Sequence, residues 1–191
     1  MRIGIDISQI AFPATGVSNF IYQLVTNLIK QDSKNQYILF GSSLRQRRVF
    51  YVLQETLKLH KNVQIKIFPF PPTVLEFIWN RMHILPIELL VGNIDVFLSS
   101  DWVQPPTKAK NATILYDLII YKYPKETHEQ WKFSLKNLIV SPNIVASQKR
   151  RLQWVKRECD VIMCISEATK KDAKEILGID EKKLRVVYPG V

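Results

Sequence analysis

Short apolar runs that alternate with segments of helical periodicity constrain the fold of this chain more than any other feature. Runs typical of β-strands lie at residues 2–7, 36–40, 63–68, 94–98, 112–116, 160–165 and 184–188. Several are continuously apolar, as in strands that helices cover on both faces. Right-handed crossovers between such strands give a doubly wound, parallel α/β sheet, which is the fold class that we predict.

The segments between these runs predict helices. We expect them within residues 17–29, 44–59, the Trp79 segment, 126–158 and 167–177. Ser18 or Asn19 is expected to cap the first helix, and Gly178 to end the last. The Ser-Pro-Asn sequence is expected to interrupt the long segment, which is helical only in parts.

Composition is that of a globular domain. The chain has 191 residues, of which 47% are hydrophobic and 23% charged, so a substantial core is expected and disorder is not. The first residues lack the pattern of a signal peptide, and charged residues and Pro86 interrupt the longest apolar stretch, so no membrane span is expected. Cys159 and Cys164 are interpreted as free thiols, and three scattered histidines do not favour a metal site.

The charge indicates an acidic partner. The net charge is +10 and the pI about 9.6, which suits nucleic acid, anionic lipid or a phosphorylated substrate, although solubility alone also explains it. The chain has no nucleic-acid motif, so we do not expect nucleic acid. Basic residues beside apolar ones suit an anionic membrane surface, or simply the solvated face of a helix; they are Arg45, Arg47, Arg48, Lys149, Arg150, Arg151, Lys156 and Arg157, with Trp154.

Polar residues follow several predicted strands at their carboxyl ends. Tyr116 and Asp117 end one strand, Thr15 and Gly16 follow the first, residues 99–102 follow the fourth, and Ser166 follows the sixth. In a parallel sheet these loops converge on one edge, where ligands bind at the reversal of strand order. We therefore expect a site at that edge.

Each of these signals has an alternative structural explanation. Asp117 is suited to orienting a ligand hydroxyl or acting as a base, but also to binding backbone N–H groups in a turn. Gly16 is suited to a helix N-terminus that approaches a phosphate, but also to an ordinary turn. Tyr116 is equally consistent with a core residue, and Ser166 with a helix N-cap whose neighbour Glu167 favours the helix dipole.

Three stretches in order along the chain resemble the N-terminal domain of GT-B glycosyltransferases of the family-4, or group-1, type. They are residues 2–24, 77–124 and 158–191. The resemblance implies one Rossmann-like half of a GT-B architecture, with an acceptor-binding domain at 1–188 and the start of a linker at 189–191. The second, nucleotide-binding domain would come from elsewhere, in the same chain or from a partner chain, so this chain is expected to be inactive alone.

The resemblance also implies an activity. Such enzymes move a sugar from a nucleotide-diphosphate sugar to a glycan or lipid-linked acceptor, with retention and without a metal or other cofactor. They would lie in the cytoplasm or peripherally on the inner face of the membrane. The alternatives are a non-catalytic subunit of a split transferase and an independent nucleotide-binding α/β protein.

Site residues follow from the matching motifs. The family's glycine loop corresponds to Thr15, Gly16 and Val17, which would face the donor phosphates or sugar across the interdomain cleft. Its His-Asp-Leu motif corresponds to residues 116–118, where Tyr116 replaces the histidine that lies near the transferred sugar and Asp117 is retained. The family's Ser-Glu motif at the cleft edge corresponds to Ser166 and Glu167. Arg150, Arg151 and Trp154 are expected on an acceptor-binding or membrane-facing surface.

Overall fold

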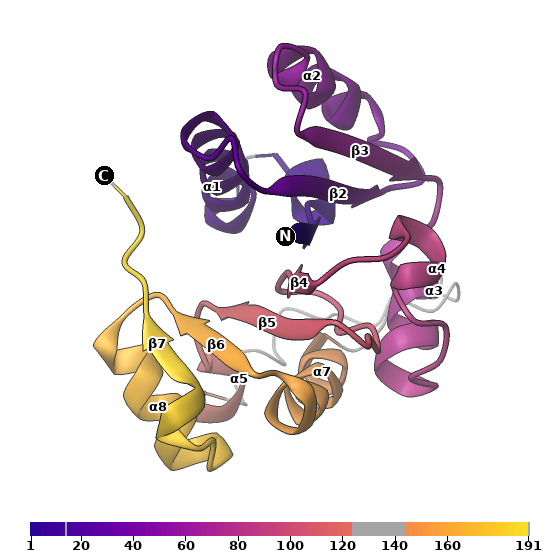
Figure 1. The fold of residues 1–191 in the computed structure, drawn as a ribbon. Helices are drawn as coiled ribbons and strands as arrows, with labels where there is room; N and C mark the ends of the chain where they lie inside the picture. The colour runs from indigo at the N-terminus through magenta and orange to yellow at the C-terminus, as the bar shows by residue number, and fades with distance from the viewer. Residues whose placement is uncertain (14, 124–143, 191) are drawn as a thin grey trace.

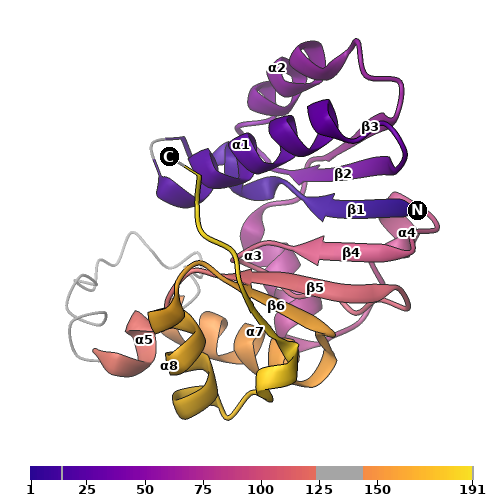
Figure 2. The ribbon, with the colours of Figure 1, turned by 60° about the vertical axis from the view of Figure 1, so that its left-hand side comes forward.

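The computed structural model describes residues 1–13, 15–123 and 144–190, and the core of the fold is one parallel sheet (Figures 1 and 2). Its strand order is β3-β2-β1-β4-β5-β6-β7, and every neighbouring pair is parallel. The strands are β1 (Arg2–Asp6), β2 (Gln36–Ser42), β3 (Val63–Phe68), β4 (Val96–Ser99), β5 (Lys110–Leu115), β6 (Val161–Cys164) and β7 (Leu184–Val186). All seven predicted strands are confirmed, with ends that differ by up to two residues.

Helices cover both faces of the sheet, as the continuous apolar strands require (Figure 1). They are α1 (Gly16–Gln31), α2 (Arg48–Leu57), α3 (Pro72–Leu75), the π-helix η2 (Glu76–Arg81), α4 (Glu88–Val91), α5 (Ile119–Lys122), α7 (Ile144–Glu158) and α8 (Glu167–Leu177), with short 3₁₀ turns η1 (Ser8–Ala11) and η4 (Glu181–Lys183). In β2, Leu39 packs in the cluster that holds α1 and α2, whereas Phe40 packs with η2 and α4. The predicted doubly wound α/β fold is therefore confirmed.

Local sequence explains most helix ends. The side chain of Thr15 caps α1 by accepting from the Ser18 amide at 3.2 Å, so the expected cap at Ser18 or Asn19 was wrong by a few residues. Ser166 caps α8 by accepting from the Thr169 amide at 3.1 Å, as expected. Gly178 ends α8 in the left-handed conformation, at φ 61°, which glycine adopts without steric cost.

The Trp79 segment is not the single helix that its composition predicted. It forms α3, then the π-helix η2, and only later α4. Pro86 disfavours helical backbone at the residue before it, and Leu85 instead has a φ of 61°. The Trp79 indole N–H donates to the Leu85 carbonyl at 2.9 Å and holds this turn closed.

The long segment at 126–158 is only partly described. Its last part is the helix α7, as expected, whereas the predicted Ser-Pro-Asn break lies outside the described residues. Cys159 and Cys164 are buried free thiols.

Candidate functional site

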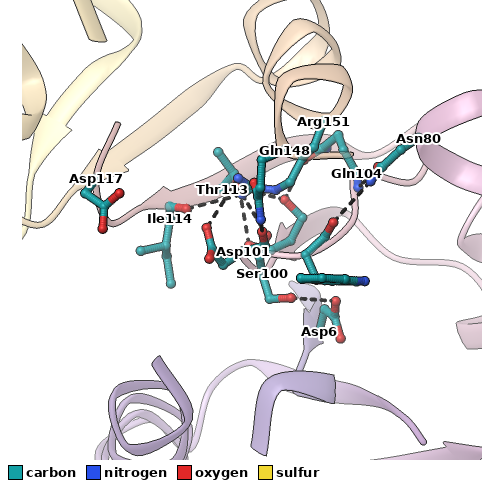
Figure 3. Close-up of polar contacts among 12 residues, drawn as sticks. Asp6, Asn80, Ser100, Asp101, Gln104, Thr113, Ile114, Asp117, Gln148 and Arg151 are labelled. Carbon is teal, nitrogen blue, oxygen red and sulfur yellow. Dashed lines mark hydrogen bonds and ion pairs between the residues drawn. The ribbon is translucent and has the colours of Figure 1, made fainter. Parts of the chain in front are cut away.

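The carboxyl edge of the sheet becomes polar where the strand order reverses, between β1 and β4 (Figure 3). Asp6 ends β1 and is buried there. One of its carboxylate oxygens accepts from the Ser8 amide and the other from the Ser100 hydroxyl, both at 2.8 Å. Burial raises the pKa of Asp6, and the hydrogen bonds from Ser8 and Ser100 oppose that rise. This buried carboxylate therefore ties the ends of β1 and β4 together at the reversal point.

Arg151 lies beneath the same edge, and its sequence-based placement on a surface was wrong. Its side chain is fully buried on the inner face of α7. Nη2 donates to the Ser100 carbonyl at 2.7 Å, to Thr113 Oγ1 at 2.8 Å and to the Ile114 carbonyl at 3.3 Å (Figure 3). Nη1 lies 3.5 Å from Asp101 Oδ1. Arg151 thus joins the ends of β4 and β5 from below.

The sequence does contain a signal for this placement. Ser147, Arg151 and Val155 are four residues apart, and all three are buried. Spacing of four places them on one face of α7. The surrounding Lys and Arg residues instead predicted an exposed basic helix, because their charge is more conspicuous in the sequence than the four-residue spacing of the buried side chains.

Arg150 and Trp154 attach α7 to η2 rather than forming a free surface. Arg150 Nη2 is 2.6 Å from the carboxylate of Glu76, which is only 2% exposed. Trp154 stacks on His83 with ring centroids 3.6 Å apart, and its indole N–H donates to the Asn80 carbonyl at 2.9 Å. Both side chains are half-buried.

The motif at residues 116 and 117 follows β5 at the carboxyl edge, as expected. The ring of Tyr116 packs edge-on against Phe20 of α1, with centroids 5.6 Å apart. Its hydroxyl is buried and makes no hydrogen bond within the described part of the chain, and burial raises its pKa. Asp117 is exposed, and its Oδ1 accepts from the Ile119 amide at 3.1 Å. Asp117 therefore organises a turn and also remains open to a ligand.

Asp101, in the loop after β4, was expected at this edge only as part of residues 99–102. Its side chain is one-third exposed and lies beside Arg151. Burial raises the pKa of Asp101 to about 6; Arg151 lowers it, and Asp117 raises it. The composition of the loop gave no signal for this perturbation, because Arg151 is distant in sequence.

The glycine turn lies at the start of α1, on the β1 side of the edge. Thr15 and Gly16 are exposed and Val17 is half-buried against the core. A Cβ on Gly16 would meet nothing within 4 Å, so local packing does not require glycine here. A groove of about 480 Å³ opens beside it between α1 and α2, with Tyr22 and Val52 in its lining. The helix N-terminus therefore faces open space.

The Ser-Glu pair lies at the start of α8, beside the end of β6. The Thr169 hydroxyl donates to the Tyr116 carbonyl at 3.0 Å, so this turn is linked directly to the strand-end motif. Ser166 is occupied as a cap, and Glu167 is exposed. The structure thus brings Ser166 beside Tyr116, while Thr15 and Gly16 lie at the same edge on the other side of the reversal point.

These observations define a Rossmann-like α/β domain whose candidate ligand site is the polar carboxyl edge at the β1–β4 reversal. The model of the family described as Glycosyltransferase Family 4 matches residues 14–191. The chain therefore belongs to glycosyltransferase family 4, as an N-terminal domain of the GT-B type. A comparison with curated proteins found no match. No helix in the described part of the chain combines the length and the hydropathy needed to cross a bilayer.

Proposed function

We propose that this chain is the acceptor-binding domain of a retaining, metal-independent glycosyltransferase that uses a nucleotide-diphosphate sugar. The observation that carries the proposal is the family match over 14–191, on a sheet whose reversal point is polar and open. In this chemistry the acceptor oxygen forms a bond to C1 of the sugar while the bond from C1 to the diphosphate oxygen breaks. The hydroxyl proton leaves with that diphosphate oxygen, and the sugar carries oxocarbenium charge in the transition state.

The charges at the edge suit the acceptor side of such a reaction. Asp101 and Asp117 present carboxylates there, and Arg151, the cation that pairs with Asp101 in the described part of the chain, is buried beneath it. Carboxylates accept hydrogen bonds from sugar hydroxyls and favour developing positive charge on the sugar, whereas they repel a diphosphate. We propose that the diphosphate is neutralised partly by the N-terminus of α1 at Gly16 and mainly by a second, nucleotide-binding domain.

A basic loop at the same edge supports a lipid-linked acceptor. Arg45, Arg47 and Arg48 are exposed between the end of β2 and the start of α2, and Val49 and Val52 of α2 line the groove beside α1. Basic side chains near an anionic bilayer each contribute on the order of 1 kcal/mol of binding. We propose that this loop meets anionic lipid while the groove receives the acceptor.

Sugar transfer by a complete GT-B enzyme, in which this domain is combined with a nucleotide-binding domain, tests the function. The protein is incubated with UDP-, GDP- and ADP-linked sugars and a panel of glycan and lipid-linked glycan acceptors, and products are detected by mass spectrometry and NMR. We expect transfer from one nucleotide class, with the anomeric configuration retained and no inhibition by EDTA. This chain by itself should give no product. Transfer with none of the donors would overturn the function, and robust transfer by this chain alone would overturn its assignment as a half-site.

A further inference from the structure

We propose that Asp101 is the carboxylate that receives the acceptor hydroxyl, and that Arg151 is the positioning residue beneath it. This inference rests on the proposed function and adds a residue that the family motifs do not assign. Three features of the structure carry it: the rigidity of the loop that holds Asp101, the hydrogen-bonding capacity that its carboxylate leaves unused, and the charges that surround it.

Side chains from two other elements hold the backbone of the loop at residues 100–104 (Figure 3). Asn80, from η2, donates to the Trp102 carbonyl at 3.1 Å and accepts from the Gln104 amide at 3.0 Å. Gln148, from α7, donates to the Asp101 carbonyl at 2.6 Å. Arg151, also from α7, donates to the carbonyl immediately before it. Asp101 therefore projects from a backbone that is fixed before any ligand arrives, as a site residue requires.

The carboxylate of Asp101 differs from the other two carboxylates at this edge. Asp6 accepts from Ser8 and Ser100, and Asp117 accepts from the Ile119 amide. Among the residues that the structure describes, no donor makes a hydrogen bond to the Asp101 carboxylate, and its partner Arg151 approaches only to ion-pair distance, at 3.5 Å. An ionised carboxylate has about four acceptor positions. Those of Asp101 are left for a ligand, because its side chain is one-third exposed.

The guanidinium of Arg151 is also incompletely used. It is fully buried, yet neither Nε nor Nη1 has a hydrogen-bond partner within the described residues. A buried charge of this kind costs free energy unless it stabilises something nearby. Its position behind Asp101 is consistent with one role, which is to keep that carboxylate ionised and oriented despite its burial.

The groups around Asp101 define when it is ionised. Arg151 faces it from α7, Asp117 and Tyr116 face it from the loop after β5, and Asp6 interacts with the same arginine from β1. With a pKa of about 6, Asp101 is ionised at neutral pH and protonated in mild acid. An ionised Asp101 accepts a hydrogen bond from a hydroxyl, and a protonated one loses much of that capacity. The acceptor group that fits is therefore a hydroxyl of a neutral or cationic sugar, whereas a phosphate is repelled.

Asp101→Asn tests the proposal, because it keeps the shape and removes the charge. Measured in the complete GT-B enzyme at pH 7.5, kcat/KM should fall by at least about tenfold, and the loss of rate that the wild type shows below about pH 6 should flatten. Asp160→Asn, the same change at the amino edge before β6, should leave both unchanged. A wild-type rate in Asp101→Asn would overturn this inference and leave the proposed function standing, whereas a wild type without transfer activity would overturn both.

Stability separates a ligand-binding role from a structural one. A carboxyl whose pKa is raised in the folded state, here from 3.8 to about 6, contributes stability below pH 3.8 that is lost as the pH rises through 6. Asp101→Asn removes that loss, so its melting temperature at pH 7.5 should equal or exceed that of the wild type. A lower melting temperature would show that Asp101 serves the fold.

Arg151→Lys tests the positioning role. The pH below which the rate falls should be higher in this variant than in the wild type, because the ammonium pairs less closely with Asp101. If that pH does not change, Arg151 does not position Asp101.

Discussion

At the scale of single residues, the buried arginine under the carboxyl edge should dominate the energetics. Arg151 donates hydrogen bonds to the carbonyls of Ser100 and Ile114 and to the hydroxyl of Thr113. Among the described residues it is also the only cation in ion-pair contact with Asp101. Arg151→Met should lower the free energy of unfolding by about 3–5 kcal/mol, because the three buried acceptors lose their donor at a cost of about 1–3 kcal/mol each. Urea denaturation monitored by circular dichroism measures this loss.

Arg150→Met is the matched control for that experiment. Arg150 is the neighbouring residue on α7, its side chain is 30% exposed, and its partner Glu76 retains a second arginine, Arg81, at 3.2 Å. The loss should therefore be clearly smaller than for Arg151→Met. Equal losses for the two variants would contradict the view that the buried guanidinium holds the strand ends.

A separate prediction concerns the effect of Asp117 on turnover. Asp117→Asn keeps an oxygen for the Ile119 amide, so folding should persist. Turnover of the complete GT-B enzyme should fall by at least about tenfold, or roughly 1.4 kcal/mol of transition-state stabilisation, because in the proposed site this variant removes a charge near the transferred sugar. Tyr116→Phe should cost less, since its ring packs on Phe20 and its hydroxyl has no partner among the described residues. Turnover near that of the wild type in Asp117→Asn would reduce this residue to a turn former.

At the scale of secondary-structure elements, the strands were predictable from the sequence, whereas the breaks in the helical segment around Trp79 were not. Continuous apolar runs specify buried parallel strands, and all seven were placed within two residues. The π-helix η2 was not predictable from periodicity, because its register depends on the contact of Asn80 with the distant loop at Trp102 and of Trp79 with the turn before Pro86. The capping of α1 by Thr15 instead of Ser18 is a boundary error of the usual size.

The candidate site was also predictable only in part, because the sequence indicated which edge it occupies but not its long-range contacts. The strand-end rule placed Tyr116, Asp117 and Ser166 at the correct edge from sequence alone. The ion pair of Asp101 and Arg151 joins residues fifty positions apart and depends on the rotation of α7, which local pattern does not encode. Long-range partners of this kind are why the polar network required the structure.

One glycine shows how tightly α2 packs on the sheet. Gly41 lies within β2, and a Cβ there would come 2.9 Å from the ring of Phe50. Both are buried on the β2–α2 interface, and the contact falls on Cγ, Cδ1 and Cε1 of a fully buried ring, which has little room to move aside. Gly41→Ala should lower the free energy of unfolding by about 1–3 kcal/mol, the usual cost of overpacking. Thermal unfolding measures the loss, and Gly16→Ala, where a Cβ meets nothing, is the control. An unchanged melting temperature in Gly41→Ala would show that α2 shifts freely.

At the scale of the whole molecule, two groups of exposed basic residues lie at opposite ends of the sheet. Arg45, Arg47 and Arg48 are exposed at the carboxyl edge, whereas Lys156 and Arg157 are exposed at the other end of the sheet, where α7 precedes β6. If the edge that binds the acceptor also meets the membrane, only the first group should matter for lipid binding. Net charge alone would make both groups equivalent.

Vesicle co-sedimentation distinguishes these cases. Binding to vesicles with anionic lipid should rise with the anionic fraction and fall with salt. Replacing Arg45, Arg47 and Arg48 by serine should reduce binding by roughly tenfold or more, since each basic residue contributes on the order of 1 kcal/mol. Replacing Lys156 and Arg157 by serine should have little effect. Equal losses in the two variants, or binding that ignores salt, would contradict an oriented membrane contact.

The central claim is that the carboxyl edge at the β1–β4 reversal receives the hydroxyls of a neutral acceptor sugar. Amide NMR shifts of this chain, titrated with methyl α-D-glucopyranoside and methyl α-D-mannopyranoside at concentrations up to well above about 1 mM, test it most directly. We predict shift changes confined to amides around residues 100–102, 116–118 and 166–167, and smaller changes at those positions with inorganic phosphate. Shifts that cluster at the amino edge, near residues 95 and 160, or stronger changes at residues 100–102 and 116–118 with phosphate than with either glycoside, would contradict the account.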